Sequence, residues 1–272
     1  MSAAPGRSKQ ARTAGTPASA PSTPAAPPGR CTLVGAGPGD PELLTLKALK
    51  ALQAATVVLV DDLVSEAIVA LAPPGARIVH VGKRGGCKST PQALIEQLML
   101  DAVRAGEHVV RLKGGDPFIF GRGGEEVEHL RAAGVAVEVV SGITAAMAGM
   151  ALLGAPLTHR AHAQGVVFIT GHGKAGGPAT DWRLLAATAR DLRLTLVIYM
   201  GMAGSAHIQQ ELLHGLPGGT PVAVVQHVSL PHQRHAVTTL DQLHATIARE
   251  GLGSPSVIVV GDVVRGVQAL QN

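Results

Sequence analysis

The sequence predicts an α/β protein of two domains, and three observations lead to this fold class. Short β-branched runs alternate with amphipathic segments along the 272 residues, which is the pattern of strand–helix–strand units in a parallel sheet. Two such series follow each other, separated by a helix and linker over 141–160. The chain is 46% hydrophobic and only 15% charged, and it is long enough to bury a substantial core.

The first series predicts a mostly parallel N-terminal sheet. Strands are expected at 31–35, 56–61, 76–81, 107–112 and 135–140. Helices are expected between them at 42–54, 91–105 and 123–133. Several of these strands are continuous apolar runs, as a sheet covered on both faces requires.

The second series predicts a mixed sheet. Strands are expected at 165–170, 194–200, 221–227, 235–240 and 255–261, with helices at 181–190, 205–214 and 241–250. The connection between the third and fourth strands is too short for a helix, so these two strands should be antiparallel. We therefore expect an N-terminal domain over 31–142, a C-terminal domain over 143–272 and an active-site cleft between them.

Residues 1–30 are expected to form a disordered tail rich in alanine and proline. They lack the apolar core of a secretory signal. An organelle transit peptide is the alternative, since the tail contains arginines and no acidic residue, but its prolines would break an amphipathic helix. Its four basic residues equal the whole net charge of +4, which leaves the folded part neutral.

Composition excludes several functional classes. A neutral folded part with 2% aromatic residues disfavours nucleic-acid binding. No apolar run approaches the roughly eighteen residues of a membrane span, so no membrane association is expected. Cys31 and Cys87 are the only cysteines and neither has a partner at metal-ligand spacing, which favours a reducing, cytoplasmic compartment.

Three loops rich in small residues follow predicted strands. The first, 35–40, has glycines in a G-x-G-x-G order that breaks the dinucleotide fingerprint, and Pro38 lacks the N–H that a pyrophosphate would need. Alone, it also fits a tight strand-to-helix turn. The second, within 111–126, places Asp116 beside two glycines, where it could hold a ribose hydroxyl or an amino-acid group. The third, 141–146, could be a simple helix cap. Together the three loops indicate a ligand site.

The motifs that carry these loops occur in an order that resembles a known family. They are VGAGPGDPELLTLKAL, DDLVS, VGKRGG, RLKGGDPFIFGRGGEE, SGITAA, PLTHR, TGH and YMG. Over residues 31–265 the chain is similar to the uroporphyrinogen-III C-methyltransferases of the tetrapyrrole methylase superfamily. The resemblance implies the tetrapyrrole methylase fold, with S-adenosylmethionine bound between the two α/β domains, and a homodimer.

The resemblance also implies a reaction. Methyl groups would pass from S-adenosylmethionine to carbons 2 and 7 of uroporphyrinogen III, giving precorrin-2 and S-adenosylhomocysteine in the branch toward sirohaem and cobalamin. Because the pyrrole carbon is already electron-rich, the enzyme mainly has to align carbon, methyl and sulfur. A base must then accept a proton, and no metal is needed.

By motif match, the resemblance assigns three sets of residues. Asp61 corresponds to a proton acceptor and Lys83 to a proton donor. The cofactor positions are Pro38, Gly114, Gly115, Asp116, Ile119, Thr144, Ala145, Met200 and Val228, the last being a position where relatives often have glycine. Since the substrate bears eight carboxylates, its expected cationic partners are Arg84, Lys113, Arg122 and Arg160.

Other hypotheses compete with this one. The pairs His159–His162 and His232–His235 suggest a metal site, but they lack an HExxH helix or cysteine partners, so none is expected. A methylase of another corrinoid is disfavoured by the GKRGG and LTHR strings. A nicotinamide or flavin oxidoreductase would need the missing G-x-G-x-x-G motif. A non-catalytic tetrapyrrole-binding protein would not need both Asp61 and Lys83.

Overall fold

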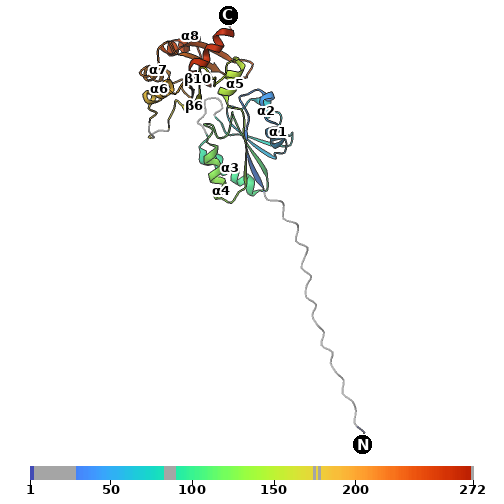
Figure 1. Ribbon diagram of the computed structural model, residues 1–272. Coiled ribbons are helices and arrows are strands. Elements are labelled where there is room, and N and C mark those ends of the chain that lie inside the picture. Colours follow the sequence, from blue (N-terminus) through green and yellow to red (C-terminus); the bar gives the residue numbers. More distant parts are fainter. Residues whose placement is uncertain (3–28, 83–89, 174–175, 177–178, 271–272) are drawn as a thin grey trace.

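The computed structural model describes residues 1–2, 29–82, 90–173, 176 and 179–270. Most of the predicted tail therefore lies outside the described residues, as do Lys83 and Arg84. The described chain forms two domains, each with a five-stranded sheet and its own helices (Figure 1). This arrangement confirms the predicted fold class.

The N-terminal sheet has the strand order β3-β2-β4-β1-β5 and is parallel throughout, not only mostly parallel. Its strands are β1 (Arg30–Gly35), β2 (Val57–Val60), β3 (Arg77–His80), β4 (His108–Lys113) and β5 (Val137–Val140). Its helices are α1 (Leu46–Gln53), α2 (Glu66–Val69), α3 (Gln92–Arg104) and α4 (Gly123–Ala132).

The single helix predicted over 42–54 is divided in two. A 3-10 turn, η1 (Pro41–Leu43), precedes α1. Asp40 accepts a hydrogen bond from the Glu42 N–H, and Thr45 accepts one from the Ala48 N–H at 3.1 Å. Because each side chain caps a separate helical start, the chain bends between them.

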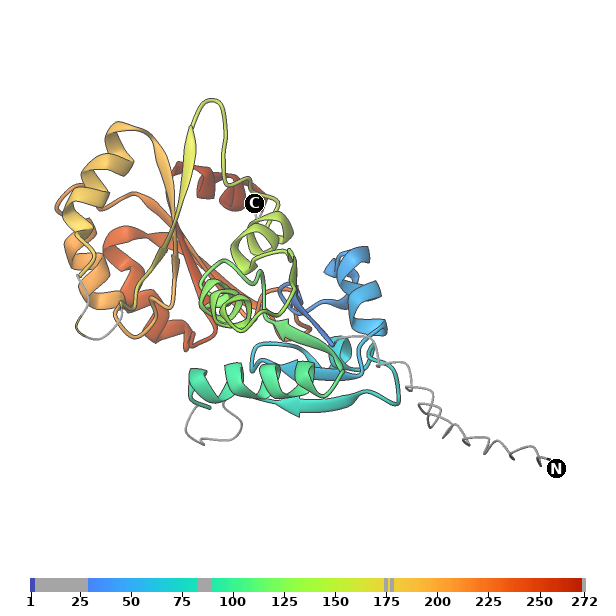
Figure 2. The same cartoon turned by 90° about the horizontal axis from the view of Figure 1, so that it is seen from below.

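Helices cover both faces of the N-terminal sheet, as the apolar strands predicted. Buried residues of α3 and α4, including Met99 and Leu130, pack on the face that carries Leu33. Residues of α1 and α2, including Leu52 and Ile68, pack on the opposite face (Figure 2). The alternation of side chains along each strand sends neighbouring residues into different hydrophobic clusters.

The C-terminal sheet has the order β6-β7-β10-β8-β9. Its strands are β6 (Gly165–Thr170), β7 (Leu194–Tyr199), β8 (Pro221–Gln226), β9 (Arg234–Thr239) and β10 (Ser256–Val260). Only β6 and β7 are parallel; the predicted antiparallel pair is β8 and β9. The remaining helical elements are α5 (Ala145–Leu152), α6 (Trp182–Asp191), α7 (Ser205–Leu212), η2 (Leu240–Gln242), α8 (Leu243–Glu250), η3 (Asp262–Val264) and α9 (Arg265–Leu270).

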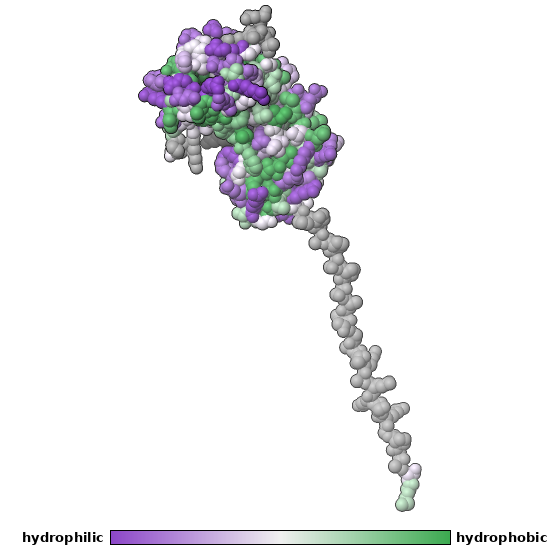
Figure 3. Space-filling view, viewed as in Figure 1, coloured by the Kyte–Doolittle hydropathy of each residue, from purple (hydrophilic) through white to green (hydrophobic). Residues whose placement is uncertain are grey.

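The two faces of this sheet also differ in their covering helices. Helices α6, α7 and α8 cover one face, while α5 and the segment from η3 onward cover the other. Hydrophobic residues also gather near the junction of the two domains, and hydrophilic residues cover much of the outer C-terminal domain (Figure 3). Among the described residues, no helix is long and apolar enough to cross a membrane.

Glycines allow the three loops after β1, β4 and β5 to meet. Gly37 and Gly115 pair as an isolated antiparallel bridge, with the Gly115 N–H donating to the Gly37 carbonyl at 2.7 Å. Both residues have positive φ angles, +69° and +67°, which favour glycine. Beneath them, a Cβ atom on Gly142 would lie 2.2 Å from the Gly115 carbonyl oxygen. The loops are therefore in direct backbone contact.

We expect Gly142→Ala to destabilise the fold by about 1–3 kcal/mol, because the added methyl group would meet main-chain atoms that cannot move independently. Urea unfolding followed by circular dichroism measures the change. Gly75→Ala is the matched control, since a Cβ there meets nothing within 4 Å. Equal stability of the two variants would contradict the close approach.

Candidate active site

A cavity opens at the carboxyl ends of the N-terminal strands and faces the C-terminal domain. Both domains line it, so it occupies the position predicted for the cleft. The structure brings together the following predicted residues on its wall: Asp61, Pro38, Gly114, Gly115, Ile119, Thr144, Ala145, Met200 and Val228. Leu230, Ser254 and Val257 of the C-terminal domain complete much of the remaining lining.

The loop after β1 is held between the two domains. On the N-terminal side, the Ser65 hydroxyl donates to the Gly39 carbonyl at 2.6 Å. On the C-terminal side, the Asp40 N–H donates to the Ser229 hydroxyl at 3.0 Å. These two bonds fix the loop that carries Pro38 against the cavity.

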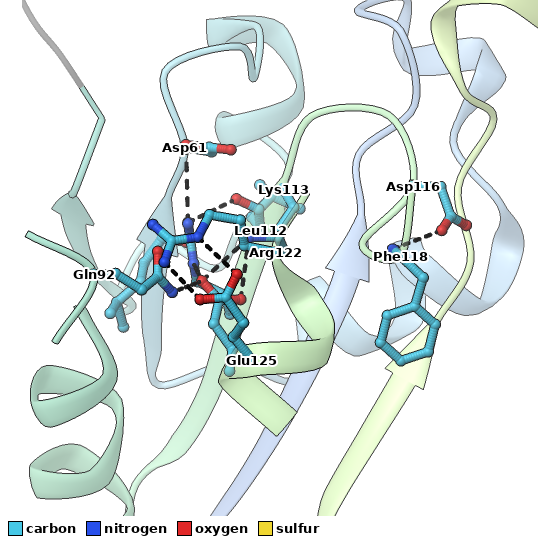
Figure 4. Close-up of polar contacts among 11 residues, drawn as sticks. Asp61, Gln92, Leu112, Lys113, Asp116, Phe118, Arg122 and Glu125 are labelled. Atoms are coloured by element: carbon cyan, nitrogen blue, oxygen red, sulfur yellow. Dashed lines mark hydrogen bonds and ion pairs between the residues drawn. The ribbon is translucent and has the colours of Figure 1, made fainter. Parts of the chain in front are cut away.

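Asp116 has a different place from the other predicted cofactor residues. Asp116 is not among the described residues that line the cavity. Its two carboxylate oxygens instead accept hydrogen bonds from the Phe118 N–H at 2.8 Å and the Gly142 N–H at 3.0 Å. Figure 4 shows the contact with Phe118. Asp116 thus braces the second loop against the third, and its contact with a cofactor stays a prediction.

Tyr199 begins the YMG motif, but the motif analysis assigned it no role; it joins the domains at the cavity wall. Its hydroxyl lies 2.7 Å from the Thr144 hydroxyl and accepts from the Ala146 N–H at 3.1 Å. Its ring packs on Phe120 at a centroid distance of 5.1 Å. Burial raises the pKa of this phenol, so it stays protonated. The sequence held two signals for it: Tyr199 begins the YMG motif, and it is the single tyrosine of the chain.

Asp61 stands at the end of β2. Its N–H donates to the Leu112 carbonyl at 3.0 Å, which extends the ladder with β4 and fixes the main chain. The carboxylate is 33% exposed and lies 3.9 Å from the buried Arg111 guanidinium. Its side chain is therefore accessible from the cavity on one side and faces a fixed cation on the other. Its predicted partner Lys83 lies outside the described residues.

The predicted substrate cations are found in different surroundings. Arg122 is exposed at the start of α4 and forms two hydrogen bonds with the Glu125 carboxylate, at 3.0 and 2.6 Å, which raise its pKa. It lines a groove with Phe118 and Met200, next to the main cavity. Arg160 is exposed in a turn closed by the pairing of His159 with Ala163. Arg84 lies outside the described residues.

Lys113 is not placed as we predicted. Its side chain is 2% exposed, and its ammonium lies 3.1 Å from the Glu126 carboxylate beneath the loop. Burial lowers its pKa, as does the nearby Arg111 guanidinium. Lys113 is the last residue of β4, and the strand directs its side chain toward α3 and α4 rather than into the cleft. We therefore replace its predicted contact with substrate by a contact with Glu126.

The histidine pairs do not form a metal centre in the described part of the chain. His159 and His162 stack at a centroid distance of 4.7 Å, and His232 packs on His227 at 4.4 Å. Within the described ranges, no group of three or more histidine, cysteine or acidic residues could hold a metal ion.

The residues present fit S-adenosylmethionine. Ile119, Val228 and Leu230 provide an apolar lining for an adenine ring and a thioether-like chain. Gly114 and Gly115 bring backbone to the wall without side chains, and Thr144 and Asp61 add oxygen atoms. The arrangement can hold a small, partly apolar ligand with one carboxylate beside it.

Comparisons with known sequences agree with this site. Residues 30–244 match the family model of the Tetrapyrrole (Corrin/Porphyrin) Methylases. The chain is 50% identical over 240 residues to a uroporphyrinogen-III C-methyltransferase of Pseudomonas aeruginosa, covering 88% of this chain and 96% of that protein. It is 52% identical to Siroheme synthase 2 of Aeromonas hydrophila over 87% of this chain, but spans only about half of that relative, 49%.

Solved structures share the fold. A uroporphyrin-III C-methyl transferase from Thermus thermophilus, complexed with S-adenyl homocysteine, aligns with a TM-score of 0.72 and 43% identity, over 87% of this chain and 93% of that one. A cobalt precorrin-4 methyltransferase aligns with a TM-score of 0.76 and 31% identity, over 86% and 95%. The family model covers most of the chain and includes the loops after β1, β4 and β5, so the chain belongs to the tetrapyrrole methylases.

Proposed function

We propose that this chain transfers methyl groups from S-adenosylmethionine to carbons 2 and 7 of uroporphyrinogen III, producing precorrin-2 and S-adenosylhomocysteine. One observation carries the proposal: the loops after β1, β4 and β5 meet around one cavity, and Asp61 lies in its wall. The similarity to the Pseudomonas enzyme, which the chain matches over almost its whole length, supports the same activity.

The chain's own residues would align the reactants. S-adenosylmethionine supplies, when bound, an electrophilic methyl group on a sulfonium. The loops after β1, β4 and β5 would hold it through backbone groups of Gly114, Gly115 and Ala145, while the apolar wall excludes water. Because those loops are tied to one another, the geometry for in-line transfer to a pyrrole carbon is fixed before substrate arrives.

The residues around the cleft divide the remaining tasks. Asp61 would accept the proton released as the ring system rearranges, since its carboxylate lies in the cavity wall. Lys83 is proposed as proton donor. Arg84, Arg122 and Arg160 are proposed partners of the substrate carboxylates.

Two further proposals concern the protein's setting. We propose a homodimer, on the family resemblance. We also propose a cytoplasmic location, which the cysteine pattern supports: the Cys31 thiol is free and buried, and burial raises its pKa to about 12, so it is unreactive.

Product mass tests the proposed function. Anaerobic incubation with uroporphyrinogen III and methyl-labelled S-adenosylmethionine should add two methyl groups per tetrapyrrole. Binding of S-adenosylhomocysteine without transfer to this substrate would reject the proposed substrate. It would favour a methylase of another corrinoid, such as the structurally similar cobalt precorrin-4 methyltransferase.

We expect Asp61→Asn to lower kcat at least a hundredfold while the Kd for S-adenosylhomocysteine stays within threefold, because the amide cannot accept the proton and changes little in shape. Initial rates and calorimetry measure the two quantities, and Lys83→Met tests the donor in the same assay. Asp101→Asn, on the exposed surface of α3, is the control. A near-parental rate for Asp61→Asn would reject its role.

We expect Tyr199→Phe to weaken S-adenosylhomocysteine binding about fivefold or more, which corresponds to ~1 kcal/mol, because the Ala146 N–H loses its acceptor and Thr144 loses its partner. Calorimetric titration gives the Kd. The phenyl ring keeps the packing on Phe120 and Phe168, so the thermal midpoint should fall by only a few degrees. Unchanged affinity would show that the hydroxyl does not order the third loop.

A further inference from the structure

A cluster of charged side chains is buried behind the cavity. Arg111 and Lys113 are each 2% exposed, and Glu126 is fully buried. Arg111 and Lys113 are two residues apart on β4, so their side chains point to the same face of the sheet, the one that α3 and α4 cover. Figure 4 shows Lys113 of this cluster near Asp61 and away from the loop that carries Asp116.

Glu126 is the centre of the cluster. One carboxylate oxygen accepts from Arg111 Nε at 3.2 Å, Lys113 Nζ at 3.2 Å and Gln92 Nε2 at 3.1 Å. Its other oxygen lies 3.1 Å from Lys113 Nζ. This one side chain therefore connects β4, α3 and α4.

The contacts of Arg111 leave one direction open. Its Nη1 lies within 3.5 Å of the Leu59 and Leu112 carbonyl oxygens, and its Nε is held by Glu126. Its Nη2 is directed at Asp61, 3.9 Å from a carboxylate oxygen. The guanidinium is planar and rigid, so anchoring its other groups fixes where its positive charge meets Asp61.

The number of charges in the cluster also indicates that it acts on Asp61. Two buried cations face a single buried carboxylate, and Asp61 is the second anion near them. A buried ion cluster contributes little to stability because desolvation offsets the attraction. A fixed geometry for a neighbouring group is a more direct consequence of this arrangement.

Lys113 connects the cluster to the cofactor loop. It immediately precedes Gly114, and its Cε atom lies 3.2 Å from the position that a Cβ on Gly121 would take. Glu126 thus holds Lys113, the residue before the loop. Glu126 itself lies near the start of α4, the helix that follows the same loop.

We propose that Glu126 is a positioning residue for methyl transfer: by anchoring Arg111 and Lys113 it sets the orientation of the Asp61 carboxylate toward the cavity. This inference rests on the proposed role of Asp61. Glu126 itself contacts neither the cavity nor a reacting atom.

The test compares Glu126→Gln with Glu128→Gln, a matched change on the exposed side of the same helix. Calorimetry with S-adenosylhomocysteine gives the Kd and the number of sites, and the methyl-transfer assay gives kcat per binding site. We expect Glu126→Gln to lower kcat per site at least tenfold with the Kd within threefold, and Glu128→Gln to match the parent. A purely structural role would lower the number of sites and leave kcat per site unchanged, which overturns the proposal.

A second pair of variants covers poor folding of Glu126→Gln. Lys113→Met combined with Glu126→Gln removes one cation and one anion, so the net buried charge is unchanged while Arg111 loses its anchor. We expect it to bind S-adenosylhomocysteine and to keep the low kcat per site. Glu126→Asp should recover part of the rate, because it retains the charge. If neither Glu126→Gln nor its combination with Lys113→Met binds S-adenosylhomocysteine, Glu126 is a folding residue and the proposal is wrong.

The parent protein separates this inference from the proposed function. If the parent does not methylate uroporphyrinogen III, the proposed function fails before the variants are compared. If the parent is active and both Glu126→Gln and its combination with Lys113→Met retain the parent's kcat per site, only the role of Glu126 is rejected.

Discussion

The site depends on one constraint: the main chain of three strand-end loops must come within contact distance. Parallel strands β4, β1 and β5 are neighbours, so their carboxyl ends deliver the loops to one edge. Gly35 and Gly142 then allow approaches that a Cβ would block, and Gly115 adopts a positive φ angle that favours glycine. The hydrogen bonds of Asp116 and the position of the cavity wall follow from that contact.

The second requirement is that the C-terminal domain closes the same edge. Ser229 receives the Asp40 N–H, which ties the first loop to the C-terminal domain, and Tyr199 receives the Ala146 N–H at the end of the third loop, where the chain enters that domain. Both bonds use a side-chain oxygen of the C-terminal domain to accept an N–H next to the cavity. The cleft is thus part of the same network that holds the loops, and not a space left between independent bodies.

Local sequence patterns predicted the sheets and the loops because strand periodicity and turn residues act over short distances. The antiparallel pair of β8 and β9 followed from the length of one connection. The division of 42–54 was not predicted, since the leucine pattern continues across Thr45, the second of two helix caps after Asp40. The buried position of Lys113 and the role of Tyr199 in the cavity wall were not predicted, for another reason. Their partners Glu126 and Thr144 are set by tertiary packing, which no local pattern contains.

The bridge between Gly37 and Gly115 also bears on how such a site changes over time. Its hydrogen bonds belong to the main chain, so substitutions on the surrounding wall leave the frame intact. Selection can then alter which ligand the pocket prefers without rebuilding the fold. The cobalt precorrin-4 methyltransferase, close in shape at 31% identity, shows how far sequences can diverge on a common scaffold.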